Sequence, residues 1–342
     1  MKTLWEYSLK TEALRILHCA RQISVGFYRA NNFYVLPYRE TNNKYSDVVF
    51  PDLPYCNIPR FWKKVASVNT ATLPIKANNG LIKQIEKLTK SSHFPKPKIT
   101  NVKKVWEKAQ KEIIKDIYQI MPDRRSAIKK IIIYPTLFGT STSFSLLKSF
   151  PATFIIYLRE DQDIYTITEA LTTSLTRSSD CHKSNPKWLE SEFLTDWLMT
   201  KSVIANVLNK YQPKTNWTPT IKQVGNKQNA RPLKESEEFY KKLGVPMLNK
   251  PFSSNGKIPL LNGKPINNLT EREREMLVAM INKKGDTLTF DELGEILFIN
   301  EKNFSLYAIS KTIQRLRDKF EENGVSGSYI QTLRGKGYLL KN

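Results

Sequence analysis

The chain has 342 residues, enough for two or three domains, and its 40% of hydrophobic residues is typical of a folded protein. Its formal net charge is +22, from 54 Lys and Arg against 32 Asp and Glu, which favours nucleic acid, and after it an anionic membrane surface, as the partner. Its three cysteines are far apart and odd in number, which argues against a disulfide framework or a zinc ribbon. Without a signal peptide's apolar run or about 18 consecutive apolar residues, we expect a cytoplasmic protein with no membrane partner.

Residues 1–211 predict an N-terminal domain of mixed α-helices and β-strands. Its clearest helix covers residues 101–121, where Val105, Ala109, Ile113 and Ile117 recur every four residues. A β-branched run from residue 129 and a second one at 152–160 predict two strands. Helices are expected at 163–177 and 185–211, and the aromatic residues of the latter are expected in the core: Trp188, Phe193 and Trp197.

Residues 212–255 predict a basic linker that ends in a short helix at 236–244. The stretch up to about residue 235 is polar and basic and holds three prolines. No GxxxxGK[ST] or GxGxxG phosphate loop and no GxSxG nucleophile elbow occurs in the chain, so we expect no cofactor.

Residues 256–342 predict a separate domain that begins with a small hairpin, turning at Asn262-Gly263. Three helices follow, with expected N-caps at Thr270, Thr289 and Ser305, and Glu273 completes a capping box with the first of them. The third helix, at 305–322, has an apolar stripe at spacings of 4, 3 and 4, and a glycine-bearing hairpin at 329–341 closes the domain. This order of elements predicts a winged helix-turn-helix, so the fold class is α+β multidomain.

The helix at 305–322 and the hairpin at 329–341 have the chemistry that DNA recognition requires. An α-helix fits the major groove, where base edges can be distinguished, and a cationic hairpin tip can reach phosphates or a narrow minor groove. We expect base-edge or adjacent phosphate contacts from Lys311, Gln314 and Arg315, within a DNA-facing set that also includes Tyr307, Ser310, Arg317, Lys319, Arg334 and Lys336. In this set, Arg317 and Lys319 are expected to contact phosphate, and Arg334 and Lys336 to form the contact of the wing.

Four segments of this domain resemble the OmpR/PhoB-type winged-helix domain of bacterial transcription regulators: "LTEREREMLVAM", "TFDELGEILF", "ISKTIQRLRDKF" and "IQTLRGKGYLL". The resemblance covers residues 257–341 and implies double-stranded DNA as the partner, association with the nucleoid and RNA polymerase as a further candidate partner. It leaves the oligomeric state open. Residues 257–342 hold 14 Lys and Arg against 11 Asp and Glu, so 22 − 3 = 19 of the net positive charges lie earlier in the chain. Further phosphate contacts are therefore expected from the N-terminal part or the linker.

The segment "TEALT" at 168–172 resembles the H-E-x-x-H helix of gluzincin metallopeptidases with both histidines replaced. Glu169 stands at the position of the general base, and Thr168 and Thr172 stand where the imidazoles would be. Glu192 follows Thr168 by 24 residues, a spacing similar to that of the third zinc ligand in thermolysin-like members. A threonine hydroxyl is a poor zinc ligand, so this resemblance, over about residues 100–205, implies a zincin-like domain without metal or catalysis.

The leading hypothesis is a DNA-binding transcription regulator with a non-catalytic N-terminal sensing or assembly domain. Three alternatives stay open at this point. One is that the segment at 168–172 belongs to an ordinary amphipathic helix. The second is that the chain is a zincin-like hydrolase targeted by a DNA-binding tail, and the third is that it is an adaptor whose winged helix binds protein.

Overall fold

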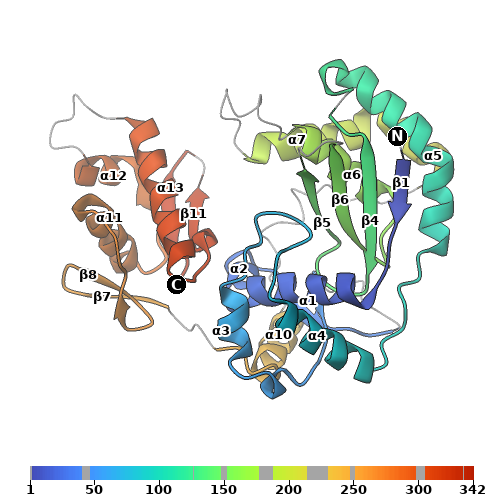
Figure 1. Cartoon of the computed structure of the whole chain (residues 1–342). Helices are drawn as coiled ribbons and strands as arrows, with labels where there is room; N and C mark the ends of the chain where they lie inside the picture. The colour runs from blue at the N-terminus through green and yellow to red at the C-terminus, as the bar shows by residue number, and fades with distance from the viewer. Residues whose placement is uncertain are drawn as a thin grey trace. The chain divides into compact units, whose positions relative to one another are not determined.

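The computed structural model describes residues 2–40, 47–125, 127–147, 152–176, 188–213, 230–246, 251–297, 305–333 and 335–342. The chain divides into two compact units (Figure 1). Unit 1 contains Met1–Cys19, Tyr34–Pro59 and Val68–Phe239, and unit 2 contains Ala20–Phe33, Arg60–Ser67 and Tyr240–Asn342. In the described part of the chain, no helix is both long and apolar enough to cross a membrane.

A four-stranded sheet organises unit 1. The strand order is β1 (Lys2–Trp5), β4 (Lys130–Thr136), β6 (Thr153–Arg159) and β5 (Thr142–Leu147). The first three strands are parallel, and β5 runs antiparallel to β6 at one edge. The sequence predicted β4 and β6, whose β-branched and aromatic residues suit buried strands.

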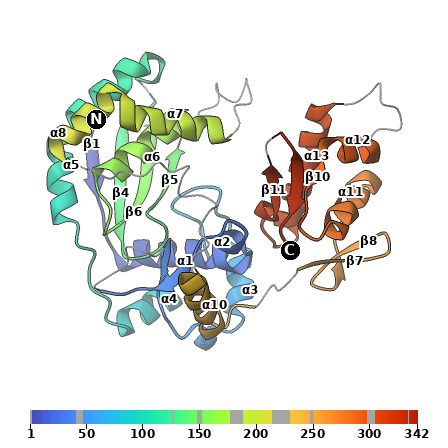
Figure 2. The ribbon, with the colours of Figure 1, turned by 180° about the vertical axis from the view of Figure 1, so that it is seen from behind.

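Helices cover the face of the sheet that carries Ile131, Ile133, Phe154 and Ile156. α5 (Thr100–Ile120) places the predicted stripe of Ala109, Ile113 and Ile117 in this core, while Val105 is only partly buried. α6 (Ile164–Thr176), α7 (Trp188–Lys201) and α8 (Val203–Tyr211) complete the layer, with α8 packed along α5 (Figure 2). The N-terminal part of the chain is therefore a mixed α/β unit, as its sequence predicted.

α1 (Leu9–Ser24) begins directly after the first strand and lies across the carboxyl ends of the parallel strands (Figure 1). Its Arg15 is fully buried, and the guanidinium donates to the carbonyls of Phe138 and Thr140 and to the hydroxyl of Ser143. Unit 1 also contains η1 (Tyr55–Asn57), α4 (Asn79–Ser91), η2 (Pro122–Arg124) and a parallel pair of strands, β2 (Val35–Pro37) and β3 (Val48–Phe50).

One sequence expectation about unit 1 is wrong. Phe193 and Trp197 on α7 are 53% and 54% exposed, although their aromatic character placed them in the core. In the part of this helix whose side chains are described, Thr195, Asp196, Leu198 and Met199 are buried instead. The side chain of Trp188 lies outside the described residues.

Unit 2 contains the predicted winged-helix elements. Strands β7 (Phe252–Asn255), β8 (Ile258–Leu261) and β9 (Lys264–Pro265) form a small sheet, and the Asn262-Gly263 turn joins β8 to β9 with positive φ at both residues. α11 (Glu271–Asn282), β10 (Leu288–Thr289), α12 (Phe290–Leu297) and α13 (Leu306–Glu322) follow, then η5 (Gly327–Tyr329) and the hairpin of β11 (Ile330–Leu333) and β12 (Gly337–Leu340). β10 pairs with β12, which makes the hairpin part of a three-stranded sheet.

Segments from earlier in the chain also belong to unit 2. They include the end of α1, α2 (Phe27–Ala30) and α3 (Phe61–Ala66), and α10 (Ala230–Lys242) ends in this unit. The backbone N–H of Ser326 donates to the carbonyl of Val25 at 2.8 Å, and the amide of Gln331 donates to the carbonyl of Ala30 at 2.6 Å. These two hydrogen bonds join segments that lie about 300 positions apart in the chain.

Candidate nucleic-acid interface

α13 is an amphipathic helix whose inner face is fully buried. Ser305 caps its N-terminus, with the Ser305 hydroxyl accepting from the backbone N–H of Ala308 at 3.3 Å. The predicted apolar stripe packs into the core of unit 2 with no exposed area: Ile309, Ile313, Leu316 and Phe320. The helix is therefore held firmly from one side.

The opposite face of α13 presents polar and cationic side chains to solvent. Tyr307 is 69% exposed, and Ser310, Lys311, Gln314 and Arg315 are exposed as well. The ammonium of Lys311 lies 5.9 Å from the centre of the Tyr307 ring, and the Gln314 amide donates to Asp318 at 2.9 Å. These five predicted residues thus share one outward face over the first three turns.

The last turns of α13 are acidic. Asp318, Glu321 and Glu322 are exposed, and Lys319 is bound to Glu322 at 3.0 Å. Three carboxylates near a phosphate backbone are repulsive, so the electrostatics favour nucleic acid only at the N-terminal half of the helix. The apolar periodicity of the sequence gives no sign of this division.

Arg317 faces the wing instead of solvent. Its guanidinium donates to the carbonyl of Ile330 at 2.8 and 3.1 Å and to the hydroxyl of Thr332 at 3.0 Å. Burial lowers the pKa of this guanidinium from its ordinary value. Arg317 therefore fixes β11 against α13, a role that the sequence reasoning missed when it assigned Arg317 to phosphate.

The wing is a tight hairpin whose geometry depends on glycine. Gly335 has a φ of +68°, and Gly337 has a φ of +148°. A Cβ on Gly337 would lie 2.1 Å from the Leu288 carbonyl oxygen of the neighbouring strand β10, so only glycine fits at this position. Lys336 is exposed at the tip, and its backbone carbonyl accepts from the N–H of Phe290 at 3.2 Å. The second predicted wing cation, Arg334, lies outside the described residues.

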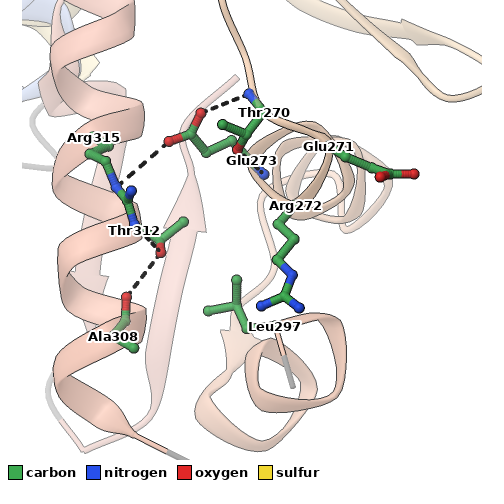
Figure 3. Close-up of a pocket in the computed structure, with 8 residues that line it drawn as sticks. All are labelled: Thr270, Glu271, Arg272, Glu273, Leu297, Ala308, Thr312 and Arg315. Carbon is green, nitrogen blue, oxygen red and sulfur yellow. Dashed lines mark hydrogen bonds and ion pairs between the residues drawn. The ribbon is translucent and has the colours of Figure 1, made fainter. Parts of the chain in front are cut away.

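A pocket of about 450 Å³ lies between the N-terminus of α11 and the N-terminal half of α13 (Figure 3). On its α11 side, Glu273 closes the predicted capping box with Thr270 and is only 3% exposed. The other oxygen of Glu273 lies 3.7 Å from the guanidinium of Arg315, which also donates to Thr312 at 3.4 Å. Arg315 is therefore positioned at the edge of the outward face by an anionic partner on another helix.

The positions that resemble a lost metal site lie on α6 in unit 1. Thr168 and Thr172 are fully buried, and their hydroxyls donate at 2.8 Å to the carbonyls of Ile164 and Thr168. Both hydroxyls are thus engaged by their own helix. Glu169 is half-buried, and the side chain of Glu192 lies outside the described residues. Among the residues that the structure describes, no group of three His, Cys, Asp or Glu side chains is placed to hold a metal ion.

Comparison with known families agrees with the geometry of unit 2. Residues 263–340 match the family described as "Transcriptional regulatory protein, C terminal". The match spans the turn after β8, all three helices and both strands of the wing. These residues therefore form an OmpR/PhoB-type winged helix-turn-helix, a DNA-binding domain of transcription regulators.

Proposed function

We propose that the protein is a sequence-specific DNA-binding transcription regulator in which α13 enters the major groove and the β11–β12 wing contacts the flanking backbone. One observation carries this proposal. The inner stripe of α13 is fully buried, while Lys311, Gln314 and Arg315 point outward beside the wing. Direct readout requires hydrogen-bonding and cationic side chains on a helix that its domain holds rigidly.

The individual roles follow from where the side chains lie. Lys311 and Gln314 are the base-reading residues, since both are exposed in the first half of the helix, with Tyr307 and Ser310 beside them. Arg315 reads a base edge or contacts the adjacent phosphate after it leaves the weak pairing with Glu273. Lys336 and Arg334 bind phosphate from the wing. Lys319 adds a weaker phosphate contact because Glu322 competes for its ammonium, and Arg317 keeps the wing in position.

Non-specific affinity comes largely from outside the winged helix, which carries only +3 of the net charge of +22. Four exposed lysines follow one face of α5 at helical spacing: Lys104, Lys108, Lys111 and Lys115. Removing one phosphate-binding cation should reduce the slope of log K against log salt by about 0.9. Changing all four lysines to glutamine should reduce that slope without altering the order of preferred sequences. An unchanged slope would assign these lysines to an ordinary solvated face.

For the N-terminal unit we propose a sensing or assembly role without catalysis. The engagement of Thr168 and Thr172 by their own helix supports the absence of zinc chemistry at this position. Descent from a zincin is part of this proposal. Metal analysis of the purified chain tests it, because stoichiometric zinc together with a peptidase activity that Glu169→Gln abolishes would favour the hydrolase alternative instead.

Selection of bound sequences from random DNA with the full chain tests the regulator proposal. A consensus should emerge, and the selected sites should bind at least about 10³-fold more tightly than random DNA. Lys311→Ala should weaken the preference at one position, whereas the control Lys264→Ala, on β9 of the same unit, should not. Affinity no greater than that of a generic basic protein would support the adaptor alternative. RNA polymerase is the protein partner to test on the selected site, and a tagged chain should localise to the nucleoid.

A further inference from the structure

A pocket of about 350 Å³ lies in unit 1 at the carboxyl ends of the parallel strands. Tyr7, Ser8 and Leu9 follow β1, and Leu137 and Phe138 follow β4, so the ends of two neighbouring strands form one wall. In open sheets of parallel strands, ligands bind outside the carboxyl ends of the strands. We call this cavity the Glu12 pocket after the carboxyl group that α1 places in its lining.

Glu12 is 1% exposed, and only one of its two carboxyl oxygens accepts a hydrogen bond from a described residue. One carboxyl oxygen accepts from the backbone N–H of Leu137 at 2.9 Å. The other has no hydrogen-bond partner within the described part of the chain. The Thr136 hydroxyl donates to the carbonyl of Phe138 at 3.4 Å, and Arg15 donates to the carbonyls of Phe138 and Thr140. Above about pH 7, where the carboxyl is ionised, this oxygen is a buried acceptor without a donor, so a ligand that supplies an N–H or O–H would be favoured there.

The rest of the lining combines aromatic walls with a cationic mouth. Phe94 and Phe138 contact each other edge to face with their ring centres 5.2 Å apart. Lys90, His93 and Lys96 line the same cavity and are exposed. A metal cation or an amine at the mouth would be repelled by the two ammonium groups, whereas a carboxylate or phosphate would be attracted. A ligand that fits this cavity should therefore place a hydrogen-bond donor at the buried end, an aromatic ring in the middle and an anionic group at the mouth.

We propose that the Glu12 pocket binds a small aromatic anion whose ring carries an N–H donor, with the ring against Phe94 and Phe138, the N–H facing Glu12 and the anionic group at Lys90 and Lys96. The volume of about 350 Å³ is near the lower end for ligand sites, which suits a molecule of one or two rings. Nucleoside monophosphates and indole carboxylates both have this chemistry. This inference names a class of ligand for the sensing role proposed above. The binding itself does not depend on that role, but its interpretation as sensing rests on the proposed function.

Isothermal titration of the full chain at about pH 8, where Glu12 is ionised, tests the site, with AMP, GMP, CMP and UMP in one arm and indole-3-acetate in the other. At least one probe should bind saturably, one molecule per chain, with Kd below about 1 mM. Glu12→Gln should weaken binding about tenfold or more, because an amide whose oxygen keeps the Leu137 N–H turns its own N–H groups toward the ligand. The double variant Lys90→Ala/Lys96→Ala should weaken it by a similar factor. Lys98→Ala should not, since Lys98 is an exposed cation nearby that does not line the pocket.

The proposal is overturned if neither arm shows saturable binding up to about 1 mM. It is equally overturned if the lysine double variant, whose changes are at the surface, binds as well as the parent chain. A DNA titration of the same samples separates this inference from the regulator proposal. If a probe binds in the pocket but the chain shows no specific DNA binding, the pocket proposal stands and the regulator proposal is refuted. If the chain binds DNA specifically but no probe binds, only the pocket proposal is refuted.

Discussion

Replacing Glu12 by glutamine should remove a pH dependence of stability that the fold imposes on unit 1. Burial raises the pKa of Glu12 from its ordinary 4.5 to about 7, and the nearby Glu160 adds to this rise. The Leu137 N–H, the Thr136 hydroxyl and the charge of Arg15 oppose it but are outweighed. Between these two pKa values the folded chain holds a proton that the unfolded chain has released, so the free energy of unfolding decreases as the pH rises.

The size of the effect follows from the two pKa values. The full difference, 7 − 4.5 = 2.5 units at 1.36 kcal/mol each, is about 3 kcal/mol. The contribution of the neutral carboxyl is fully present below about pH 4.5 and is lost as the pH rises through 7. Over the range from about pH 5 to pH 8, the free energy of unfolding of the parent chain should decrease relative to that of Glu12→Gln by about 2–3 kcal/mol.

Urea unfolding followed by tryptophan fluorescence measures this difference. Trp62 is the one of the six tryptophans whose position falls in unit 2, so 6 − 1 = 5 fall in unit 1 and the signal reports mainly on that unit. Glu6→Gln, which replaces an exposed carboxylate just after β1, is the matched control and should follow the parent chain. Parallel pH profiles for the parent chain and Glu12→Gln would show that Glu12 is already ionised in the folded state, and the reasoning would be refuted.

Three further predictions concern unit 2. Lys311→Ala should cost about 1–3 kcal/mol on the preferred DNA site and relax specificity at one position, measured by competition between single-base variants of the site. Lys336→Ala should weaken all sequences alike and reduce the salt slope by about one, and an effect confined to a single base position would contradict its assignment to phosphate. Gly337→Ala should destabilise the wing, because its Cβ would lie 2.1 Å from the Leu288 oxygen; a lowered unfolding temperature of unit 2 checks this, and Gly335→Ala, with no atom within 4 Å, is the milder comparison.

The winged helix was accessible from sequence because its determinants are local. The capping box at Thr270, the Asn262-Gly263 turn and the 4-3-4 spacing of the α13 stripe each depend on residues a few positions apart, and all three are present. Each also points to the same order of elements, so the individual signals reinforce one another.

The features that sequence reasoning missed depend on distant contacts. Arg317 has the same local setting as its cationic neighbours, and only the position of Ile330 directs its guanidinium to the wing. In the sequence, Glu12 is only an acidic residue in the first turn of a helix. Its burial and its bond to the backbone N–H of Leu137 join residues 125 positions apart, so local sequence patterns do not reveal them. Phe193 and Trp197 were predicted in the core but are exposed, because aromatic character alone does not determine which face of α7 packs against the core.

Charge and recognition are divided between the two parts of the chain. The winged helix has a nearly balanced charge, and the last turns of α13 are acidic. The few cations of its predicted DNA-facing set, such as Lys336, supply a limited number of phosphate contacts, so sequence preference depends on the hydrogen bonds that distinguish bases. Unit 1 and the stretch before residue 257 carry the remaining excess of cations, which attract any sequence equally. An aromatic anion in the Glu12 pocket would reduce that excess only slightly. Its influence on DNA binding would therefore have to come from a change in conformation, since neutralising one or two charges of nineteen leaves the long-range attraction nearly intact.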